Sequence, residues 1–309
     1  MSIWRVTGNS SVEVNTNETP SYYVPHSSVW PIVGSIALFV TAYGGVSFIH
    51  QSTEKVAAEG SFGGLMFYVG LALIAFMMFG WFGNVIKENL DGLVSPQLDM
   101  SFRQGMGWFI ISEVMFFAAF FGALFYARVI SVPWLAGAGN NLETHLLLWP
   151  DFADTWPLFR TPAGGASGEM GPWGLPFINT AILVTSSITV TFAHWGLKKG
   201  QRGQLTFWLF LTVALGCTFL ALQVIEYMHA YEDLGLTLGS GIYGSTFFLL
   251  TGFHGAHVTL GTIMLIVMFL RVTRGHFTAD NHFAFEATSW YWHFVDVVWL
   301  FLFTFVYWF

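Results

Sequence analysis

Seven long apolar stretches, separated by polar connections, run along the chain. They are residues 29–49, 62–86, 104–130, 173–197, 204–229, 240–270 and 288–308. A helix needs roughly 20 apolar residues to cross the hydrocarbon core, whereas a barrel strand needs roughly 10. Lipid tolerates only helices and closed barrels, and the stretches are too long for barrel strands, so they predict helices. The expected fold is therefore an all-α integral membrane protein with seven transmembrane helices.

The segments outside these spans predict the organisation of the chain. Residues 1–28 form a polar tail that ends in aromatic and proline residues. The connection 131–172 is rich in proline and glycine, and this composition predicts a long external loop without a helix. We expect two further parts: residues 29–103, with the first two helices and an inner loop, and residues 104–309, with the other five helices.

The composition agrees with a membrane protein and removes several other classes. Hydrophobic residues make up 54% of the chain and charged residues only 9%, whereas a soluble domain carries about 25% charged residues. The single cysteine, Cys217, excludes a disulfide within the chain. The net charge of -7 is spread over the loops without a basic stripe, so a nucleic-acid partner is not expected.

The distribution of Lys and Arg predicts the orientation of the spans, because cytoplasmic loops carry an excess of these residues. An N-terminus inside places eight of them inside and three outside. The inside set is Arg5, Lys87, Arg103, Lys198, Lys199, Arg202, Arg271 and Arg274, and the outside set is Lys55, Arg128 and Arg160. We therefore expect a cytoplasmic N-terminus and a C-terminus on the opposite side.

Glu113 lies in the middle of the third span, in the apolar run WFIISEVMFFAAFF. An ionisable group at membrane depth is a candidate functional residue. One interpretation pairs it with a histidine or a hydroxyl of another helix, or keeps it protonated. The other ties it to proton movement or to a lipid-lined cavity. Both predict a buried carboxyl that is protonated or hydrogen-bonded.

Two histidines of the sixth span, His254 and His257, are three residues apart and can share a helix face. They suggest either a metal or haem site or, in the preferred interpretation, hydrogen bonds to neighbouring helices. The pair Glu226 and His229 has the spacing found in di-iron carboxylate bundles, but only one such motif is present. We interpret this pair as a polar cap at the membrane interface.

The seventh span contains His293 and Asp296, which can also share one face. Asp296 is expected at a depth similar to that of Glu113 and of the two histidines of the sixth span. No convincing set of ligands from several helices emerges from these positions, so the sequence predicts neither a metal site nor a catalytic residue.

Four stretches carry a resemblance to a known family. Residues 285–303, FEATSWYWHFVDVVWLFLF, resemble the last helix of subunit III of cytochrome c oxidase, and residues 245–261, STFFLLTGFHGAHVTLG, resemble its sixth helix. Residues 108–117, WFIISEVMFF, resemble the third helix, and residues 276–286, HFTADNHFAFE, the last inner loop. The resemblance runs in order over most of residues 20–309.

The resemblance implies a two-helix bundle and a five-helix bundle that form a V-shaped cleft filled with phospholipid. It implies a subunit without haem or copper of its own. Haem a and copper would belong to partner subunits of the same complex, with direct contact to subunit I, and with subunit II also present. Four positions match family residues near lipid headgroups, namely Trp81, Glu88, Arg271 and His276. Position 82 is Phe where relatives often have a second Trp.

The expected function is that of a non-redox core subunit of an aa3-type cytochrome c oxidase in a bacterial plasma membrane, with the mitochondrial inner membrane as the less favoured location. The subunit would support assembly, lipid binding, proton uptake and turnover stability while the complex reduces dioxygen to water. One alternative is the equivalent subunit of a quinol oxidase. Alternatives from other classes are a free-standing proton or solute transporter, for which no internal repeat is visible, and a haem- or metal-bearing membrane enzyme.

Overall fold

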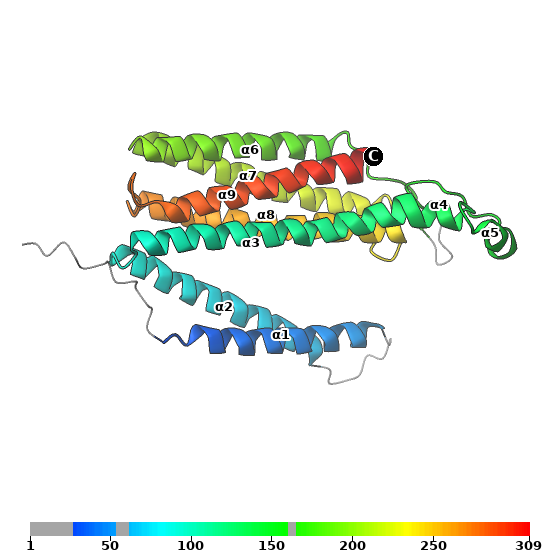
Figure 1. The fold of residues 1–309 in the computed structure, drawn as a ribbon, viewed down its shortest axis with the longest axis horizontal. Helices are drawn as coiled ribbons and strands as arrows, with labels where there is room; N and C mark the ends of the chain where they lie inside the picture. The colour runs from blue at the N-terminus through cyan, green and yellow to red at the C-terminus, as the bar shows by residue number, and fades with distance from the viewer. Residues whose placement is uncertain (1–26, 54–61, 160–164) are drawn as a thin grey trace, which may run out of the picture. The chain divides into compact units, whose positions relative to one another are not determined.

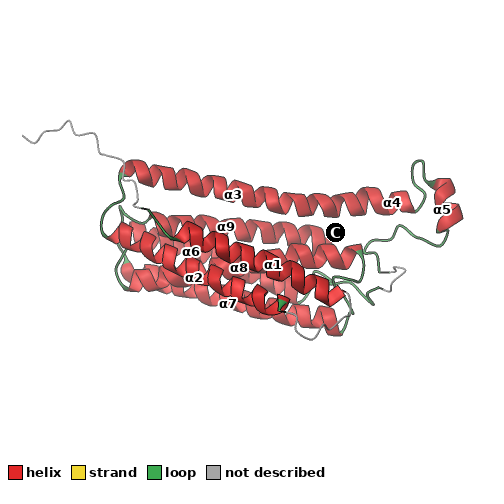
Figure 2. Ribbon diagram, turned by 90° about the horizontal axis from the view of Figure 1, so that it is seen from below, coloured by secondary structure: helices red, strands yellow, loops and turns green. Residues whose placement is uncertain are grey.

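The computed structural model describes residues 27–53, 62–159 and 165–309. Most of the predicted polar tail lies outside the described residues, as do Arg5, Lys55 and Arg160 from the orientation argument. Within the described ranges all regular structure is helical, and no strand is present (Figure 2).

Seven of the described helices are long and apolar enough to cross a membrane, as the hydrophobic pattern predicts. The bounds are α1 Trp30–Thr53, α2 Gly63–Leu90, α3 Pro96–Phe125, α6 Leu175–Lys198, α7 Arg202–Glu232, α8 Ile242–Thr273 and α9 Phe283–Leu302 (Figure 1). A π-helical segment, η2 Phe303–Trp308, continues α9 to the end of the chain. The predicted all-α membrane fold is confirmed.

The prediction that residues 131–172 contain no helix is wrong. The third span does not end near residue 130 but continues through a π-helical segment, η1 Tyr126–Ser131, into α4, Val132–Leu135. A separate short helix, α5 Leu142–Leu148, follows. Pro133 was interpreted as a helix breaker, yet it lies in α4 directly after the π-helical segment, and the helix continues through it. The wider π turn directly before it gives the proline ring room.

Glycines in the left-handed conformation end three of the long helices. At the end of α8, Gly275 has φ 73°, its N–H donates to the carbonyl of Val272, and the N–H of His276 donates to the carbonyl of Arg271. These two hydrogen bonds are those of a Schellman motif, which satisfies carbonyls that the helix itself leaves free. Gly92 after α2 and Gly200 after α6 end their helices in the same way.

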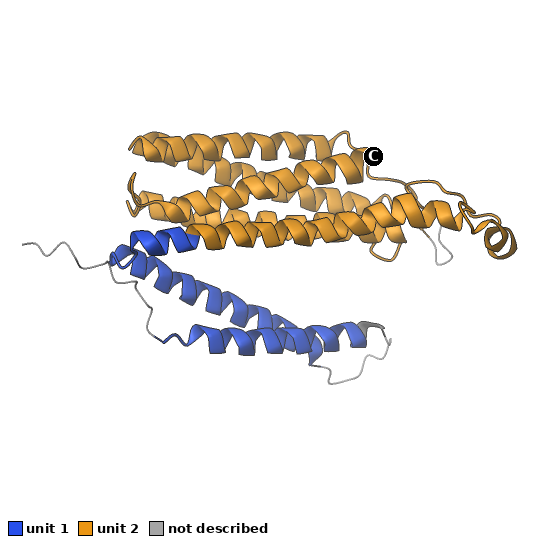
Figure 3. Ribbon diagram, viewed as in Figure 1, with its two compact units in different colours: residues 1–102 blue, residues 103–309 orange. Residues whose placement is uncertain are grey.

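The chain divides into two compact units, residues 1–102 and 103–309, with the boundary inside α3 (Figure 3). The first unit holds α1 and α2, which pack on each other along their length. A side chain at Gly70 would lie 2.6 Å from the backbone nitrogen of Thr41, and one at Gly44 would lie 2.8 Å from Cα of Phe67. Glycine is therefore required at both positions, because the two backbones approach too closely for a Cβ.

The second unit is a bundle in which α6 packs against α7 and α9, and α8 packs against α7 and α9. Tryptophans of α9 tie it to α6: Trp292 Nε1 donates to Ser186 Oγ and Trp299 Nε1 to Thr180 Oγ1, both at 2.9 Å. Both indole rings are fully buried. Buried indoles need such an acceptor for their N–H, so these bonds fix the rotation of α9 against α6.

Helix α3 reaches the rest of the second unit through large side chains. Phe116 packs edge-on against Phe253 of α8 with ring centroids 5.0 Å apart. Phe117 packs against Phe294 of α9 at 6.2 Å. Because aromatic side chains fill the space between these helices, the α3 backbone stays further away than glycine-mediated packing allows.

Candidate functional site

The two ionisable residues of α3 and α8 that the sequence singled out meet in the structure. Glu113 Oε2 lies 2.9 Å from His257 Nε2, and the two side chains are 21% and 15% exposed. Phe116 and Phe117 place their rings around the imidazole. The predicted pairing of Glu113 with a histidine of a neighbouring helix is therefore confirmed for His257.

The second nitrogen of His257 determines how this pair holds a proton. His257 Nδ1 lies 2.6 Å from the backbone carbonyl of Phe253, and a carbonyl can only accept. Nδ1 must therefore carry the hydrogen. Either a protonated Glu113 donates to a neutral Nε2, or an ionised Glu113 accepts from an imidazolium. In both cases a single proton is shared along the bond between α3 and α8.

His254 does not join this pair, although it lies three residues from His257. Its ring is fully buried and packs against Trp299, with centroids 5.1 Å apart, and against Phe219 at 5.9 Å. Neither ring nitrogen has a hydrogen-bond partner among the described residues. The prediction that both histidines hydrogen-bond neighbouring helices is therefore wrong for His254.

The interpretation of Glu226 and His229 as an interfacial cap is wrong for Glu226. Its carboxyl is fully buried and accepts a hydrogen bond from the hydroxyl of Tyr307 at 2.5 Å. His229 points elsewhere, since its Nδ1 lies 2.6 Å from Asp233 Oδ2 and both side chains are exposed. The two residues thus do not act as one motif, and Glu226 joins α7 to the end of the chain.

His293 and Asp296 of α9 both lie inside the second unit. His293 Nδ1 is 2.6 Å from the hydroxyl of Ser187 on α6. Asp296 is 7% exposed, and its Oδ1 has no hydrogen-bond partner among the described residues. Ser187 also hydrogen-bonds the Asp296 carboxyl, so both residues of α9 contact the same hydroxyl of α6.

An apolar groove runs along α3 and α9 within the second unit, with a volume of about 830 Å³. Its walls include Phe117 and Phe121 on one side and Phe294 and Phe301 on the other. Arg128 is the one charged residue among those that line it. The groove exists because the large side chains of α3 hold its backbone away from α9.

Three of the four positions matched to lipid contacts, Glu88, Arg271 and His276, lie at helix ends, whereas Trp81 lies nine residues before the last residue of α2. The Schellman hydrogen bond joins Arg271 and His276 across the end of α8. The Arg271 side chain is 5% exposed, and its guanidinium lies over the ring of Phe277 at 4.4 Å. In the first unit, Trp81 is exposed on α2. At the end of α2, the backbone carbonyl of Glu88 accepts the Schellman hydrogen bond from the N–H of Leu93 at 3.2 Å.

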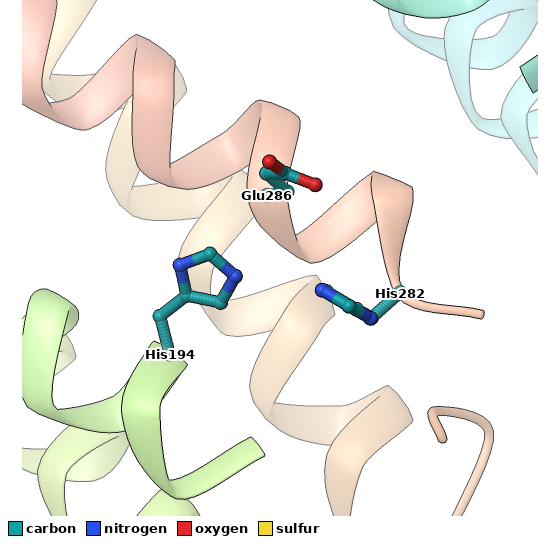
Figure 4. Close-up of side chains that lie close together, drawn as sticks. All are labelled: His194, His282 and Glu286. Atoms are coloured by element: carbon teal, nitrogen blue, oxygen red, sulfur yellow. The ribbon is translucent and has the colours of Figure 1, made fainter. Parts of the chain in front are cut away.

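Sequence reasoning missed one cluster of ionisable residues. His194 of α6, together with His282 and Glu286 at the start of α9, can each place one ligand atom within 4.8 Å of the others (Figure 4). Arg103 of α3 completes the cluster, since its Nη1 lies 2.7 Å from Glu286 Oε2. The spacing of His282 and Glu286, four residues, was a visible signal for two of the members. Nothing in the sequence linked them to His194.

The described fold and these contacts define a class: a multi-pass helical membrane protein whose ionisable residues include several that bond across helices. Comparison with known proteins identifies the family within this class. A family model described as cytochrome c oxidase subunit III matches residues 20–309. The chain therefore belongs to the cytochrome c oxidase subunit III family, whose members are membrane subunits of that respiratory oxidase.

Individual relatives are similar to this chain over nearly its whole length. A protein from Marchantia polymorpha named cytochrome c oxidase subunit 3 is 38% identical over 296 residues, 96% of this chain and 98% of that protein. Relatives of the same name from Hippopotamus amphibius and Latimeria chalumnae are 37% and 39% identical and cover 95% and 94% of this chain. In each of these two cases 98% of the relative is covered.

Proposed function

We propose that this chain is a non-redox core subunit of an aa3-type cytochrome c oxidase. It supports assembly, lipid binding, proton uptake and the turnover stability of the catalytic subunit, while the complex reduces dioxygen to water. The observation that carries the proposal is the family match over residues 20–309. In this proposal subunit I is the direct partner, subunit II belongs to the same complex, and haem a and copper reside in those partners.

The contacts of the carboxyls inside the spans support a structural role for this chain. Glu113 is bonded to His257, and Glu226 to Tyr307, in each case across two elements far apart in the sequence. A carboxyl that is fixed by a partner on another helix joins those helices, since breaking the bond would leave a polar group unsatisfied in a low-dielectric environment.

Lipid binding is supported by the shape and chemistry of the second unit. The groove along α3 and α9 is apolar along its walls and has a single lining cation, Arg128. These features suit an acyl chain with an anionic headgroup. We further propose that Trp81, Glu88, Arg271 and His276 contact lipid headgroups.

The electron donor and the location complete the proposal. Relatives over almost the full length are named for cytochrome c, which favours cytochrome c over a quinol as the donor of the complex. We propose the bacterial plasma membrane as the location, and the count of eight Lys and Arg inside against three outside supports a cytoplasmic N-terminus. The mitochondrial inner membrane is the alternative location.

Removal of this chain from the purified oxidase tests these roles. Oxygen consumption would be followed over many turnovers for the intact complex, for the complex depleted of this chain, and for the depleted complex after the chain is added back. We expect the depleted complex to start active and to lose activity sooner, and the added chain to restore the lifetime. Equal lifetimes for all three preparations would contradict the proposal.

A further inference from the structure

The strongest unassigned feature is the cluster at the end of the bundle where α6 ends and α9 begins. His194 lies four residues before the last residue of α6, Lys198, and His282 directly precedes α9. Glu286 lies in the first turn of α9. Figure 4 shows a ring nitrogen of His194 facing a ring nitrogen of His282, with the Glu286 carboxylate beside them. These three residues converge on one space from two separate segments.

The cluster contains polar atoms without partners. His194 Nε2 and His282 Nδ1 are buried and have no hydrogen-bond partner among the described residues. The two rings have centroids 5.5 Å apart at an interplanar angle of 58°, so they do not satisfy each other by stacking. Leaving a buried polar atom unpaired is unfavourable, because the atom has lost its hydrogen bonds to water. A ligand that accepts the lone pair of His194 would remove this cost.

Glu286 is positioned to supply the third ligand. Its Oε2 is engaged by Arg103 Nη1 at 2.7 Å, an interaction that fixes the orientation of the carboxylate. The other oxygen of the same carboxylate is then available for a cation. Ligating carboxylates are commonly held by a hydrogen-bonding neighbour in this manner, and such a neighbour affects metal affinity.

We propose that His194, His282 and Glu286 form a binding site for a divalent transition-metal ion, with Zn²⁺ as the preferred ion. Two imidazoles and one carboxylate are a known three-residue donor set for zinc, and they leave a fourth position for water. Tetrahedral zinc with bonds of about 2.0–2.1 Å needs ligand atoms roughly 3.3 Å apart. The three ligand atoms lie within 4.8 Å of one another, so each pair must close by at most about 1.5 Å to reach this spacing.

The charges around the site limit its affinity. Arg103 contacts Glu286 directly, and Lys198 lies one turn after His194 on the same helix. Both are cations and repel a metal ion, so we expect a dissociation constant in the micromolar range. The site lies at the ends of its helices, where an ion can arrive from water. A bound ion would join the end of α6 to the start of α9.

The test uses the full chain, purified in detergent through a tag without histidines and freed of metal with a chelator. Titration with zinc chloride, followed by calorimetry and elemental analysis, should show one zinc per chain. His194→Gln and His282→Gln should each weaken binding by about tenfold or more. His229→Gln is the matched control, because His229 is exposed and paired with Asp233, and it should leave the affinity unchanged.

Two further measurements keep the test independent of folding defects. Thermal unfolding of each variant without metal identifies variants that are destabilised. X-ray absorption at the zinc edge of the unmodified chain needs no substitution, and it should show two imidazole ligands. Absence of stoichiometric zinc, fewer than two imidazoles, or equal affinity in a folded His194→Gln variant would overturn the proposal. None of these results depends on the proposed role in the oxidase.

Discussion

The two units of this chain hold their helices together by different means. In the first unit, α2 buries only Gly63 and Gly70 among its described residues, and the helices meet backbone to backbone at glycines. In the second unit, α9 buries eleven residues, among them Trp292, Trp299 and Asp296. There the helices meet through aromatic rings and through polar bonds such as that between Glu113 and His257.

This difference assigns different tasks to the units. Lipid gives no hydrophobic driving force for helix association, so α1 and α2 depend on close packing at small residues. Their large side chains are then left facing outward, as Phe39, Phe79 and Trp81 show. The second unit buries several of its large side chains, such as Trp292 and Trp299, and contains all of the paired ionisable groups described above. The second unit therefore carries the polar bonds between helices and the proposed cation site, whereas the first unit offers an apolar surface.

The largest expected effect is at a glycine contact of the first unit. Gly70→Leu would drive a side chain into the backbone of Thr41, which lies 2.6 Å from the position of the new Cβ. We expect a loss of about 3 kcal/mol in unfolding free energy, the upper end for overpacking. Thermal unfolding of the full chain in detergent measures this. Gly83→Leu is the control, since nothing lies within 4 Å of a Cβ there.

If Gly70→Leu and Gly83→Leu melt at the same temperature, then α1 and α2 do not depend on backbone contact, and the contrast between the units fails.

A smaller effect is expected at a buried polar bond of the second unit. Tyr307→Phe removes the one hydrogen-bond donor found among the described residues for the carboxyl of Glu226, which is fully buried. The expected cost is about 1–3 kcal/mol, because the acceptor would be left unpaired. Thermal unfolding compares this variant with Tyr231→Phe, where the side chain is exposed. Equal stability of the two variants would show that the bond contributes nothing.

The pair between α3 and α8 should show a still smaller effect. Glu113→Ala leaves His257 Nε2 without its partner and should cost about 1 kcal/mol. Glu113→Gln should cost less, because its amide N–H can donate to Nε2. Infrared difference spectra of unmodified chain against Glu113→Gln should show a carboxyl that shares a proton. A carboxylate spectrum typical of exposure to water would contradict the structure.

A specific loss of lipid is expected at Arg271. Arg271→Gln removes the guanidinium that lies over Phe277, and because this guanidinium is buried the contact contributes about 2 kcal/mol to stability. We expect the purified oxidase to retain less phospholipid and to inactivate sooner during turnover. Arg274→Gln is the control, because Arg274 is exposed three residues later on the same helix end. Mass spectrometry counts the lipids.

A matching change in the first unit, Trp81→Leu, sharpens the comparison. Lipid loss in both variants would mean that both units hold lipid. Lipid content that is unchanged in the Arg271 and Trp81 variants alike would remove these residues from the proposed lipid site.

The helices were predictable from the sequence, whereas several of their ends were not. Hydropathy alone identifies seven spans, because a bilayer imposes their length. The ends depend on local geometry: Gly92 and Gly275 stop α2 and α8 several residues beyond the predicted limits. The helical turns after residue 130 were missed because Pro133 was interpreted as a helix breaker, whereas a π-helical segment precedes it and the helix continues.

The site was predictable as a set of residues but not as a set of contacts. Glu113 and His257 stand out individually as ionisable residues in apolar spans, yet 144 residues separate them in the chain. Spacing along one helix reveals neighbours on that helix and says nothing about which helices are adjacent. The same limit hid the link between His194 and His282. For the same reason, Glu226 was interpreted together with His229 on its own helix, whereas the structure pairs Glu226 with Tyr307.

The most direct test of the central claim is purification through a tag on this chain in mild detergent, with mass spectrometry and a visible absorption spectrum. The account predicts that haem-bearing oxidase subunits and phospholipid accompany the chain, and that the colour remains with the partners when the chain is dissociated. A chain that purifies alone and colourless would contradict its place in an oxidase. A dissociated chain that keeps the haem spectrum would contradict its description as a non-redox subunit.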